Sequence, residues 1–296
     1  MTQVDGYILE AGEYGPRLVL TGPWNPQIGA LMRREGVREL TLNRELGWRG
    51  QDLAFLQEIS SLVAFRILDF LIENVAPVHL LPRLRSLEVS TYCKTPIDFQ
   101  KFPFLEKCAF EWRSRSESLF ARNSLTTLFL NSYTGTRSQV FSSLSKLETL
   151  TVANSRLHEV YGLRALHRLR HLALYNLRQV RSLSGIEGLQ SLEEVEIKGC
   201  KSIDSIDELA TLQNLHRLAL VDDGSIKTLE PLRSASNLEE LYFYGTTVIV
   251  DGQLALLTEL PRLRRTSFQN RRHYSLRREQ LEAFRNWSAG GAMSGV

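Results

Sequence analysis

The apolar residues of this chain follow a short phrase that returns along most of its length. The phrase is clearest at Leu169-Arg-His-Leu172-Ala-Leu174. Its last two apolar positions recur at twelve places, with 20 to 25 residues between successive first members. The twelve pairs are Leu18/Leu20, Leu40/Leu42, Phe65/Ile67, Leu87/Val89, Cys108/Phe110, Leu128/Leu130, Leu150/Val152, Leu172/Leu174, Val195/Ile197, Leu218/Leu220, Leu241/Phe243 and Thr266/Phe268. A spacing this regular predicts a repeat protein.

Each repeat predicts a short strand followed by a turn and a helical or extended return. Apolar residues alternate over the pair, as in a strand, and are spaced more widely afterwards, as in Ile186-Glu-Gly-Leu189-Gln-Ser-Leu192. A strand with one apolar face is not stable alone, so neighbouring repeats must stack and share a core. We expect an α/β solenoid with about twelve parallel strands on its concave face, curved because the returns are bulkier than the strands.

The repeated phrase resembles that of the leucine-rich-repeat superfamily. Close matches are Leu147-Glu-Thr-Leu150-Thr-Val152, Leu215-His-Arg-Leu218-Ala-Leu220 and Leu238-Glu-Glu-Leu241-Tyr-Phe243. The period of about 22 residues, with Ile203-Asp-Ser-Ile206-Asp-Glu-Leu209 on the return, resembles the short internalin-like type. The resemblance covers approximately residues 14–270 and implies a role in protein interaction.

The turn after each strand departs from the pattern of that superfamily, which usually has Asn three residues beyond the second apolar position. The corresponding residues here include Glu45, Tyr92, Arg113, Tyr133, Ser155, Leu177, Cys200, Asp223 and Thr246. Cys, Ser, Thr and Asp can replace Asn as hydrogen-bonding residues, but Tyr, Arg and Leu cannot do so in the same way. We therefore expect the first half of the chain to be less regular than the second.

Both ends of the array need caps, because an open repeat would expose core and strand edge. Residues 7–10 are expected to pair with the Leu18/Leu20 strand, Pro26 to begin a helix, and Ser275 to cap a C-terminal helix. The residues expected to cover the last repeat are Leu276, Leu281 and Phe284. The expected divisions are an N-terminal cap (1–13), the repeat array (14–270), a capping helix (271–287) and a disordered tail (288–296).

The residues between the apolar positions are expected to face outward on the concave surface. Rigid aromatic residues flanked by charge are typical of protein-binding hot spots. The candidate partner-binding residues are Trp112, Phe129, Tyr175, Glu194, Glu196, Arg217, Glu240, Tyr242, Tyr244 and Arg265. Under the alternative interpretation these are ordinary surface residues that form cross-strand pairs and need no partner.

The loops that leave the strands in the first half form a second candidate surface. They carry Trp48, Tyr92, Trp112 and Tyr133, and the longer spacing after Leu40 indicates an insertion. Insertions in repeat proteins map to loops that often bind partners. The alternative is that Trp48 and Trp112 fold back into the local core.

The net charge of +3 is unevenly distributed along the chain. Residues 262–285 hold eight arginines against two glutamates, which gives +6 locally and leaves −3 for the rest. The alternative basic patch is Arg271, Arg272, Arg277 and Arg278. Cations beside Tyr274 are typical of single-strand nucleic-acid binders, but the basic segment spans only the last repeat and cap, so a nucleic-acid-binding module remains the alternative function.

Neither a catalytic nor a metal-binding motif is found in the sequence. It contains no Gly-x-Ser-x-Gly, phosphate-binding loop, His-Glu-x-x-His or dinucleotide motif. Cys93 could be paired with His79 or His171 as nucleophile and base, but their spacing does not require proximity, whereas Cys108 and Cys200 fit structural positions. We expect no enzyme activity, cofactor or metal.

These patterns predict a protein-binding scaffold that uses its concave sheet and adjoining loops, monomeric when unbound. Three widely spaced cysteines without a Cys-x-x-Cys pair favour reduced thiols and a cytoplasmic location. No segment approaches the roughly 18 apolar residues of a membrane helix, and no signal peptide is evident. A narrower hypothesis is a stoichiometric inhibitor or immunity-type protein.

Overall fold

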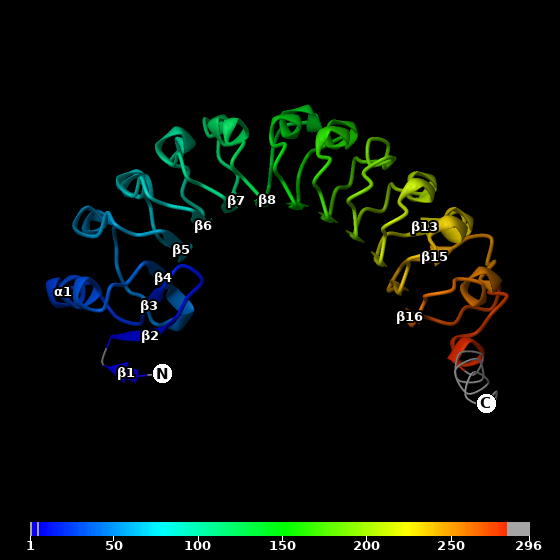
Figure 1. The fold of residues 1–296 in the computed structure, drawn as a ribbon, viewed down its shortest axis with the longest axis horizontal. Coiled ribbons are helices and arrows are strands. Elements are labelled where there is room, and N and C mark those ends of the chain that lie inside the picture. The colour runs from blue at the N-terminus through cyan, green and yellow to red at the C-terminus, as the bar shows by residue number, and fades with distance from the viewer. Residues whose placement is uncertain (1, 5, 283–296) are drawn as a thin grey trace, which may run out of the picture. The chain divides into compact units, whose positions relative to one another are not determined.

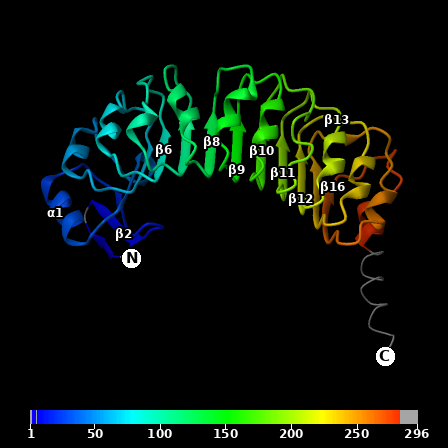
Figure 2. The same cartoon turned by 45° about the horizontal axis from the view of Figure 1, so that its top comes forward.

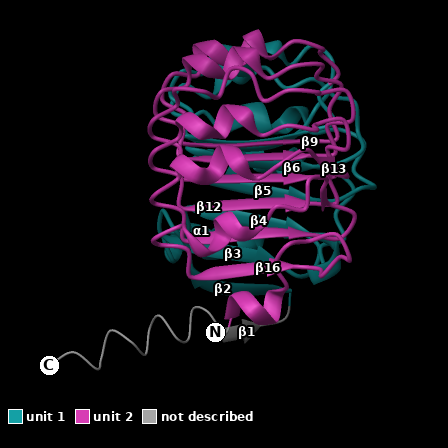
Figure 3. Ribbon diagram, turned by 90° about the vertical axis from the view of Figure 1, so that its right-hand side faces the viewer, with its two compact units in different colours: residues 1–133 teal, residues 134–296 magenta. Residues whose placement is uncertain are grey.

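The computed structural model describes residues 2–4 and 6–282 of the 296-residue chain. Its contacts divide the chain into two compact units, residues 1–133 and 134–296, which Figure 3 shows in different colours. Within each unit the strands lie on the inner, concave side and the short helical returns on the outer side (Figures 1 and 2). This arrangement confirms the expected curved α/β solenoid.

Unit 1 (residues 1–133) begins with an antiparallel hairpin that continues into parallel strands. Strand β1 (Thr2–Val4) pairs with β2 (Tyr7–Ala11), and β2 pairs antiparallel with β3 (Pro16–Leu20), as expected for residues 7–10. The next strands pair parallel in chain order and are β4 (Glu39–Asn43), β5 (Ala64–Leu68), β6 (Ser86–Ser90), β7 (Lys107–Glu111) and β8 (Thr127–Asn131).

The returns of unit 1 are one α-helix and several short 3-10 helices. Helix α1 (Pro26–Arg34) starts with proline in its first turn, and the Asn25 side chain accepts the Ile28 N–H at 3.1 Å, as an N-cap does. This confirms the helix expected to begin at Pro26. The 3-10 helices are η1 (Arg44–Leu46), η2 (Ala54–Glu58), η3 (Ala76–Leu80), η4 (Phe99–Lys101) and η5 (Glu117–Ala121).

Unit 2 (residues 134–296) contains parallel strands in chain order and a small outer sheet. The inner strands are β9 (Thr149–Ala153), β10 (His171–Tyr175), β11 (Glu194–Lys198), β12 (Arg217–Val221), β14 (Glu240–Tyr244) and β16 (Arg265–Phe268). The outer sheet, which the sequence did not predict, pairs β13 (Ser225–Ile226) with β15 (Val248–Ile249). The 3-10 helices are η6 (Ser138–Ser143), η7 (Tyr161–Ala165), η8 (Asp207–Thr211), η9 (Glu230–Ser234) and η10 (Ala255–Thr258).

Each of the twelve predicted apolar pairs lies within one of these parallel strands, β3 to β12, β14 and β16. In β10, for example, Leu172 and Leu174 are buried while His171, Ala173 and Tyr175 are half-buried on the opposite face. Burying a leucine side chain contributes about 1.5–3 kcal/mol, so the pairs hold strands and returns together.

The turns of unit 2 are tied together by a ladder of side chains, which we call the turn ladder: Cys200, Asp223 and Thr247. Cys200 Sγ accepts the Leu177 N–H at 3.4 Å, Asp223 Oδ1 accepts the Cys200 N–H at 2.8 Å, and Thr247 Oγ1 accepts the Asp223 N–H at 3.1 Å. The three side chains therefore replace the asparagine of the usual pattern.

Thr246 was expected in this ladder, and that prediction is wrong. A residue with positive φ stands directly before the ladder residue in the previous turns, as Asp222 does at 58°. After β14 the positive φ of 69° falls on Gly245, and one extra residue separates it from Thr247. Thr246 instead donates its N–H to Asp222 Oδ1 at 3.0 Å.

The C-terminal helix begins at residue 278, so the prediction of Ser275 as its N-cap is wrong. Ser275 instead closes the last turn, because its Oγ accepts the Leu254 N–H at 2.9 Å and its N–H donates to the Gly252 carbonyl at 2.8 Å. Leu281 is buried, as expected. Phe284, the rest of the helix predicted to 287 and the tail predicted at 288–296 lie outside the described residues. The predicted domain limits of the array, 14–270, stay a prediction.

Candidate protein-binding surface

Charged side chains form a continuous row across the concave face of unit 2. Arg217 on β12 stands between Glu194 on β11 and Glu240 on β14, as the strand register requires. Its guanidinium lies 3.8 Å from a Glu194 oxygen, 3.8 Å from a Glu196 oxygen and 3.5 Å from a Glu240 oxygen. Arg265 on β16 pairs with the other oxygen of Glu240. Opposite charges thus alternate from strand to strand.

Tyrosine side chains lie among these charges. The Arg217 guanidinium carbon lies 5.5 Å from the centre of the Tyr242 ring, and the Tyr242 hydroxyl donates to Glu240 at 3.1 Å. Burial, together with Glu196, raises the pKa of Tyr175, and burial with Glu240 raises that of Tyr242. The Tyr242 ring and hydroxyl are thus held between Arg217 and Glu240.

We call this set the concave patch: Tyr175, Glu194, Glu196, Arg217, Glu240, Tyr242, Tyr244 and Arg265. The cross-strand ion pairs expected under the alternative interpretation are present, and exposed pairs of this kind contribute only about 0–1 kcal/mol each. The pairs still leave surface for a partner, since Tyr244 is 43% exposed and the Arg265 side chain 71%. The patch combines exposed area with side chains that are already oriented.

The remaining predicted residues lie elsewhere. Phe129 is 39% exposed on β8 of unit 1, where it faces the concave side. Trp112 does not form an exposed anchor, because its indole is 8% exposed and packs against Phe120 and Tyr133 at ring-centre distances of 5.7 and 4.8 Å. Its assignment to the binding surface is therefore corrected to a place in the core, and Trp48 is fully buried.

The loops of unit 1 nevertheless expose aromatic side chains that sequence reasoning mostly missed. Phe70 and Tyr92 are 46% and 69% exposed, and their ring centres are 4.6 Å apart. Leu71 beside them is 67% exposed. The signal was available, because Phe70 and Leu71 lie in the turn that follows β5, where polar residues are usual.

The four arginines of the basic patch do not act as one surface. Arg271 donates to the carbonyls of Gly245 and Thr247 at 3.2 and 3.3 Å, and so closes a turn. Arg278 lies 3.6 Å from Glu282, while Arg272 and Arg277 are exposed. The cationic surface is therefore smaller than the sequence suggested.

The cysteines occupy places that do not assemble a catalytic pair. Cys108 and Cys200 are buried, and burial raises the pKa of the Cys200 thiol to about 12. Cys93 Sγ lies 3.3 Å from Thr91 Oγ1 and accepts from Arg113 at 3.4 Å, whereas His79 accepts the Asp98 N–H.

Metal sites and membrane spans were also sought in the described part of the chain. Within residues 2–4 and 6–282, no group of three or more His, Cys, Asp or Glu side chains is placed so that it could hold a metal ion. No helix in that part of the chain is long and apolar enough to span a membrane.

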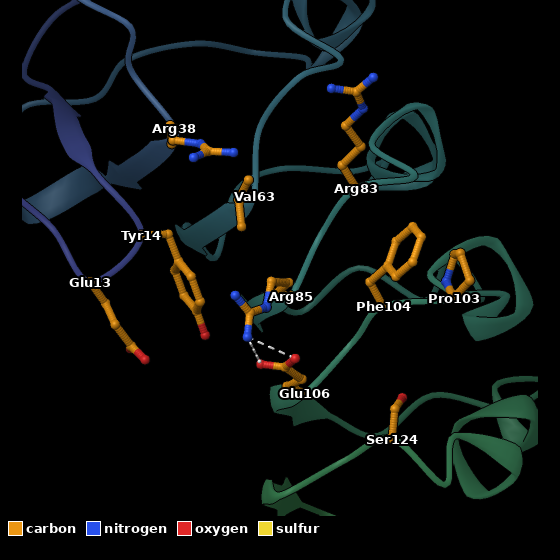
Figure 4. Close-up of a pocket in the computed structure, with 10 residues that line it drawn as sticks. All are labelled: Glu13, Tyr14, Arg38, Val63, Arg83, Arg85, Pro103, Phe104, Glu106 and Ser124. Atoms are coloured by element: carbon orange, nitrogen blue, oxygen red, sulfur yellow. Dashed lines mark hydrogen bonds and ion pairs between the residues drawn. The ribbon is translucent and has the colours of Figure 1, made fainter.

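A cleft in unit 1 was not foreseen from the sequence (Figure 4). It has a volume of about 650 Å³ and lies where strands β4 to β7 begin. Its lining residues are Glu13, Tyr14, Arg38, Val63, Arg83, Arg85, Pro103, Phe104, Glu106 and Ser124. These residues are scattered over more than one hundred positions, and only the stacking of repeats brings them together.

Comparison with known proteins supports the fold. Residues 134–237 match the family model of the endo-beta-N-acetylglucosaminidase EndoS LRR domain. The crystal structure of an internalin, InlF, from Listeria monocytogenes is 17% identical with a TM-score of 0.62, covering 87% of this chain and 83% of that chain. A leucine-rich-repeat protein of Leptospira interrogans is 14% identical with a TM-score of 0.47, covering 84% and 75%. Among curated protein sequences, none matches this chain.

The chain therefore has the leucine-rich-repeat fold of the internalin-like type, as its repeated phrase predicted. This fold is typical of protein-binding scaffolds. The fold does not identify the partner, because leucine-rich repeats serve many unrelated functions.

Proposed function

We propose that this protein binds a protein partner through the concave patch of unit 2. The observation that carries the proposal is the contact of Arg217 with Glu194, Glu196, Glu240 and the Tyr242 ring. It orients charged and aromatic groups on one accessible sheet face. Aromatic residues and arginine are enriched in binding hot spots, so the composition supports the same role.

In this proposal the members of the patch have different tasks. Tyr244, with its exposed ring, and Tyr242 supply apolar contact area, while the Tyr244 hydroxyl supplies a hydrogen-bond donor and the Tyr242 hydroxyl, which donates to Glu240, can accept one. Glu194 and Arg265 provide opposite charges on either side, which select a partner of complementary pattern. Side chains already held by neighbours lose less conformational entropy on binding, and this favours affinity.

A narrower version of the proposal is that binding inhibits the partner in a stoichiometric complex, as an inhibitor or immunity-type protein does. The oriented side chains support tight binding, which such inhibition requires. A cytoplasmic location is part of this version and is supported by three free cysteines, since thiols persist in reducing compartments. Titration of a captured enzyme or toxin with this protein tests the version, and unchanged activity at saturation would exclude it.

The central experiment is affinity capture followed by mass spectrometry. We expect the main captured protein to be lost with Tyr242→Ala/Tyr244→Ala. The matched control is Phe70→Ala/Tyr92→Ala, which removes two partly exposed aromatic rings from unit 1 and should leave capture unchanged. Capture that survives the first variant and fails with the second would move the binding surface to the loops of unit 1.

The nucleic-acid alternative stays a prediction, and it is tested by looking for RNA or DNA in the captured material. It requires bound RNA or DNA whose retention falls steeply with salt and when Arg272 and Arg277 are neutralised. Retention by this route, without a captured protein, would replace the present proposal.

A further inference from the structure

The cleft of unit 1 has a rigid floor. Arg38, Val63, Arg85 and Glu106 each stand directly before one of the strands β4 to β7. The backbone N–H of Val63 donates to the carbonyl of Arg38 at 2.8 Å. In the same way, Arg85 donates to the carbonyl of Val63 and Glu106 to the carbonyl of Arg85, both at 2.8 Å. The sheet hydrogen bonds thus continue beneath the cleft and fix the backbone from which its side chains extend.

One wall is the loop of the β2–β3 hairpin, which is fixed across the strand ends. The Tyr14 N–H and the Arg17 guanidinium both donate to the Glu39 carboxylate, which is almost fully buried at 3% exposure. Lys107 on β7 pairs with Glu13 of the loop at 2.5 Å. A Cβ at Gly12 would lie 2.4 Å from the Glu39 carboxyl carbon, so a larger residue there would displace this carboxylate from its partners. The wall is therefore built into the unbound protein.

The charges of the cleft are unbalanced. Both acidic residues of its lining are neutralised, since Arg85 donates to the two oxygens of Glu106 at 2.7 and 2.9 Å and Glu13 is paired with Lys107. Arg38 and Arg83 are exposed and have no acidic partner among residues 2–4 and 6–282. Figure 4 shows both along one edge of the cleft, above Tyr14 and Phe104. Two guanidinium groups are thus left for a ligand.

Apolar groups also line the cleft. Phe104 is 60% exposed, and the Tyr14 ring carries the Arg85 guanidinium at 5.1 Å from its centre. Val63 and Pro103 complete the apolar part of the lining. An exposed aromatic ring within a preformed cleft favours an apolar contact with a ligand.

We propose that this cleft binds an acidic segment of a protein partner, in which one apolar side chain stands between two carboxylates. Arginine forms bidentate hydrogen bonds with carboxylates, so Arg38 and Arg83 would each hold one. The apolar side chain packs on Phe104 and Tyr14. A volume of about 650 Å³ falls in the range of about 300–1,000 Å³ typical of ligand sites. In an extended segment alternate side chains share one face, which favours the order Glu-x-Leu-x-Glu.

Fluorescence anisotropy with labelled synthetic peptides tests the site directly. We expect the full-length protein to bind a peptide containing Glu-Ser-Leu-Ser-Glu, and to bind versions with Gln in place of Glu, or Ser in place of Leu, at least about tenfold more weakly. Arg38→Gln/Arg83→Gln should weaken binding by a similar factor, and Phe104→Ala should remove the preference for Leu over Ser.

The matched control is Arg156→Gln/Arg181→Gln, which removes the same charge from two exposed positions of unit 2. Equal weakening by this control would reduce the effect to non-specific attraction and overturn the proposal. Absence of peptide binding would also overturn the proposal. If the peptide did not bind but a labelled oligothymidylate bound in a way that depends on Arg38 and Arg83, the cleft would be a nucleic-acid site instead. Tyr242→Ala/Tyr244→Ala should leave peptide binding unchanged, so failure of the concave patch and failure of the cleft are distinguishable.

Discussion

The two units build the same parallel strands but stabilise the turns after them by different chemistry. In unit 2 the turn ladder of Cys200, Asp223 and Thr247 passes hydrogen bonds from one repeat to the next. In unit 1 Arg113, 2% exposed, donates to Thr91 and Cys93 of the neighbouring turn at 3.2 and 3.4 Å. Arg113 was expected not to replace the asparagine, because arginine has no acceptor atom. It bridges the turns as a donor instead.

Aromatic packing replaces further ladder bonds in unit 1. Trp112, Phe120 and Tyr133 contact one another, with ring-centre distances of 4.8 to 5.7 Å. Such rings bury a large apolar area, whereas a hydrogen bond has a net contribution of about 0.5–1.5 kcal/mol. The comparison teaches that the apolar pairs define the strands, while the turn can be closed by several kinds of side chain.

The largest expected effect is on this aromatic cluster. Trp112→Ala should lower the free energy of unfolding by about 3–5 kcal/mol, because it removes a buried indole and leaves a cavity. Chemical denaturation followed by circular dichroism measures the change. Tyr92→Ala, at a side chain 69% exposed, is the control and should change stability by less than about 0.5 kcal/mol. A stable Trp112→Ala protein that fails only in partner capture would restore Trp112 to the binding surface.

The second effect concerns the buried carboxyl group of the turn ladder. Burial raises the pKa of Asp223 from 3.8 to about 7, although hydrogen bonds from backbone N–H groups oppose the shift. The folded state therefore holds the proton more tightly than the unfolded state. The stabilising contribution is present in full below about pH 4 and is lost as the pH rises to about 7. We expect a loss of roughly 2–4 kcal/mol from this group over that interval.

Asp223→Asn tests the assignment, because asparagine keeps the acceptor oxygen for the Cys200 N–H and cannot ionise. The variant should be more stable than the wild type at pH 8 and should lack this part of the pH dependence in denaturation curves. Asp222→Asn, at the half-buried neighbouring position, is the control. An unchanged pH profile in Asp223→Asn would mean that another group titrates.

A smaller effect is expected at the last member of the ladder. Thr247→Val removes the hydroxyl that accepts the buried Asp223 N–H at 3.1 Å, while keeping nearly the same shape. Leaving that donor unsatisfied should cost about 1–3 kcal/mol. Thr246→Val changes the exposed neighbour and should have little effect on denaturation midpoints. Equal denaturation midpoints for the two variants would contradict the assignment of Thr247, rather than Thr246, to the turn ladder.

How far the sequence predicts this molecule depends on which interactions are local. The strands were predictable because their buried positions are apolar and recur at a nearly fixed spacing, as at Leu172 and Leu174. The place of Thr247 was not, because it depends on a backbone turn at Gly245 that shifts the register by one residue. Ser275 was misplaced for a similar reason, since its hydroxyl closes a turn with Leu254.

The sites were less predictable than the fold because they require knowledge of three-dimensional neighbours. Alternation along strands was enough to place Arg217 beside Glu194 and Glu240. It could not show that Trp112 turns inward, since a tryptophan after a strand fits either an exposed loop or the core. The contact of Glu13 with Lys107, 94 residues away, has no local signal at all.

The smallest expected effect concerns the concave patch and distinguishes its role from that of the turn ladder. Arg217→Gln removes a guanidinium whose side chain is 34% exposed and whose partners can pair with water instead. Stability should fall by less than about 1 kcal/mol, as is usual for exposed ion pairs, and denaturation in low and high salt measures this. Partner capture should nevertheless weaken, because the tyrosine ring beneath Arg217 and the carboxylates around it lose their common contact. A loss of stability above about 2 kcal/mol with unchanged capture would instead make the row part of the scaffold, like the turn ladder.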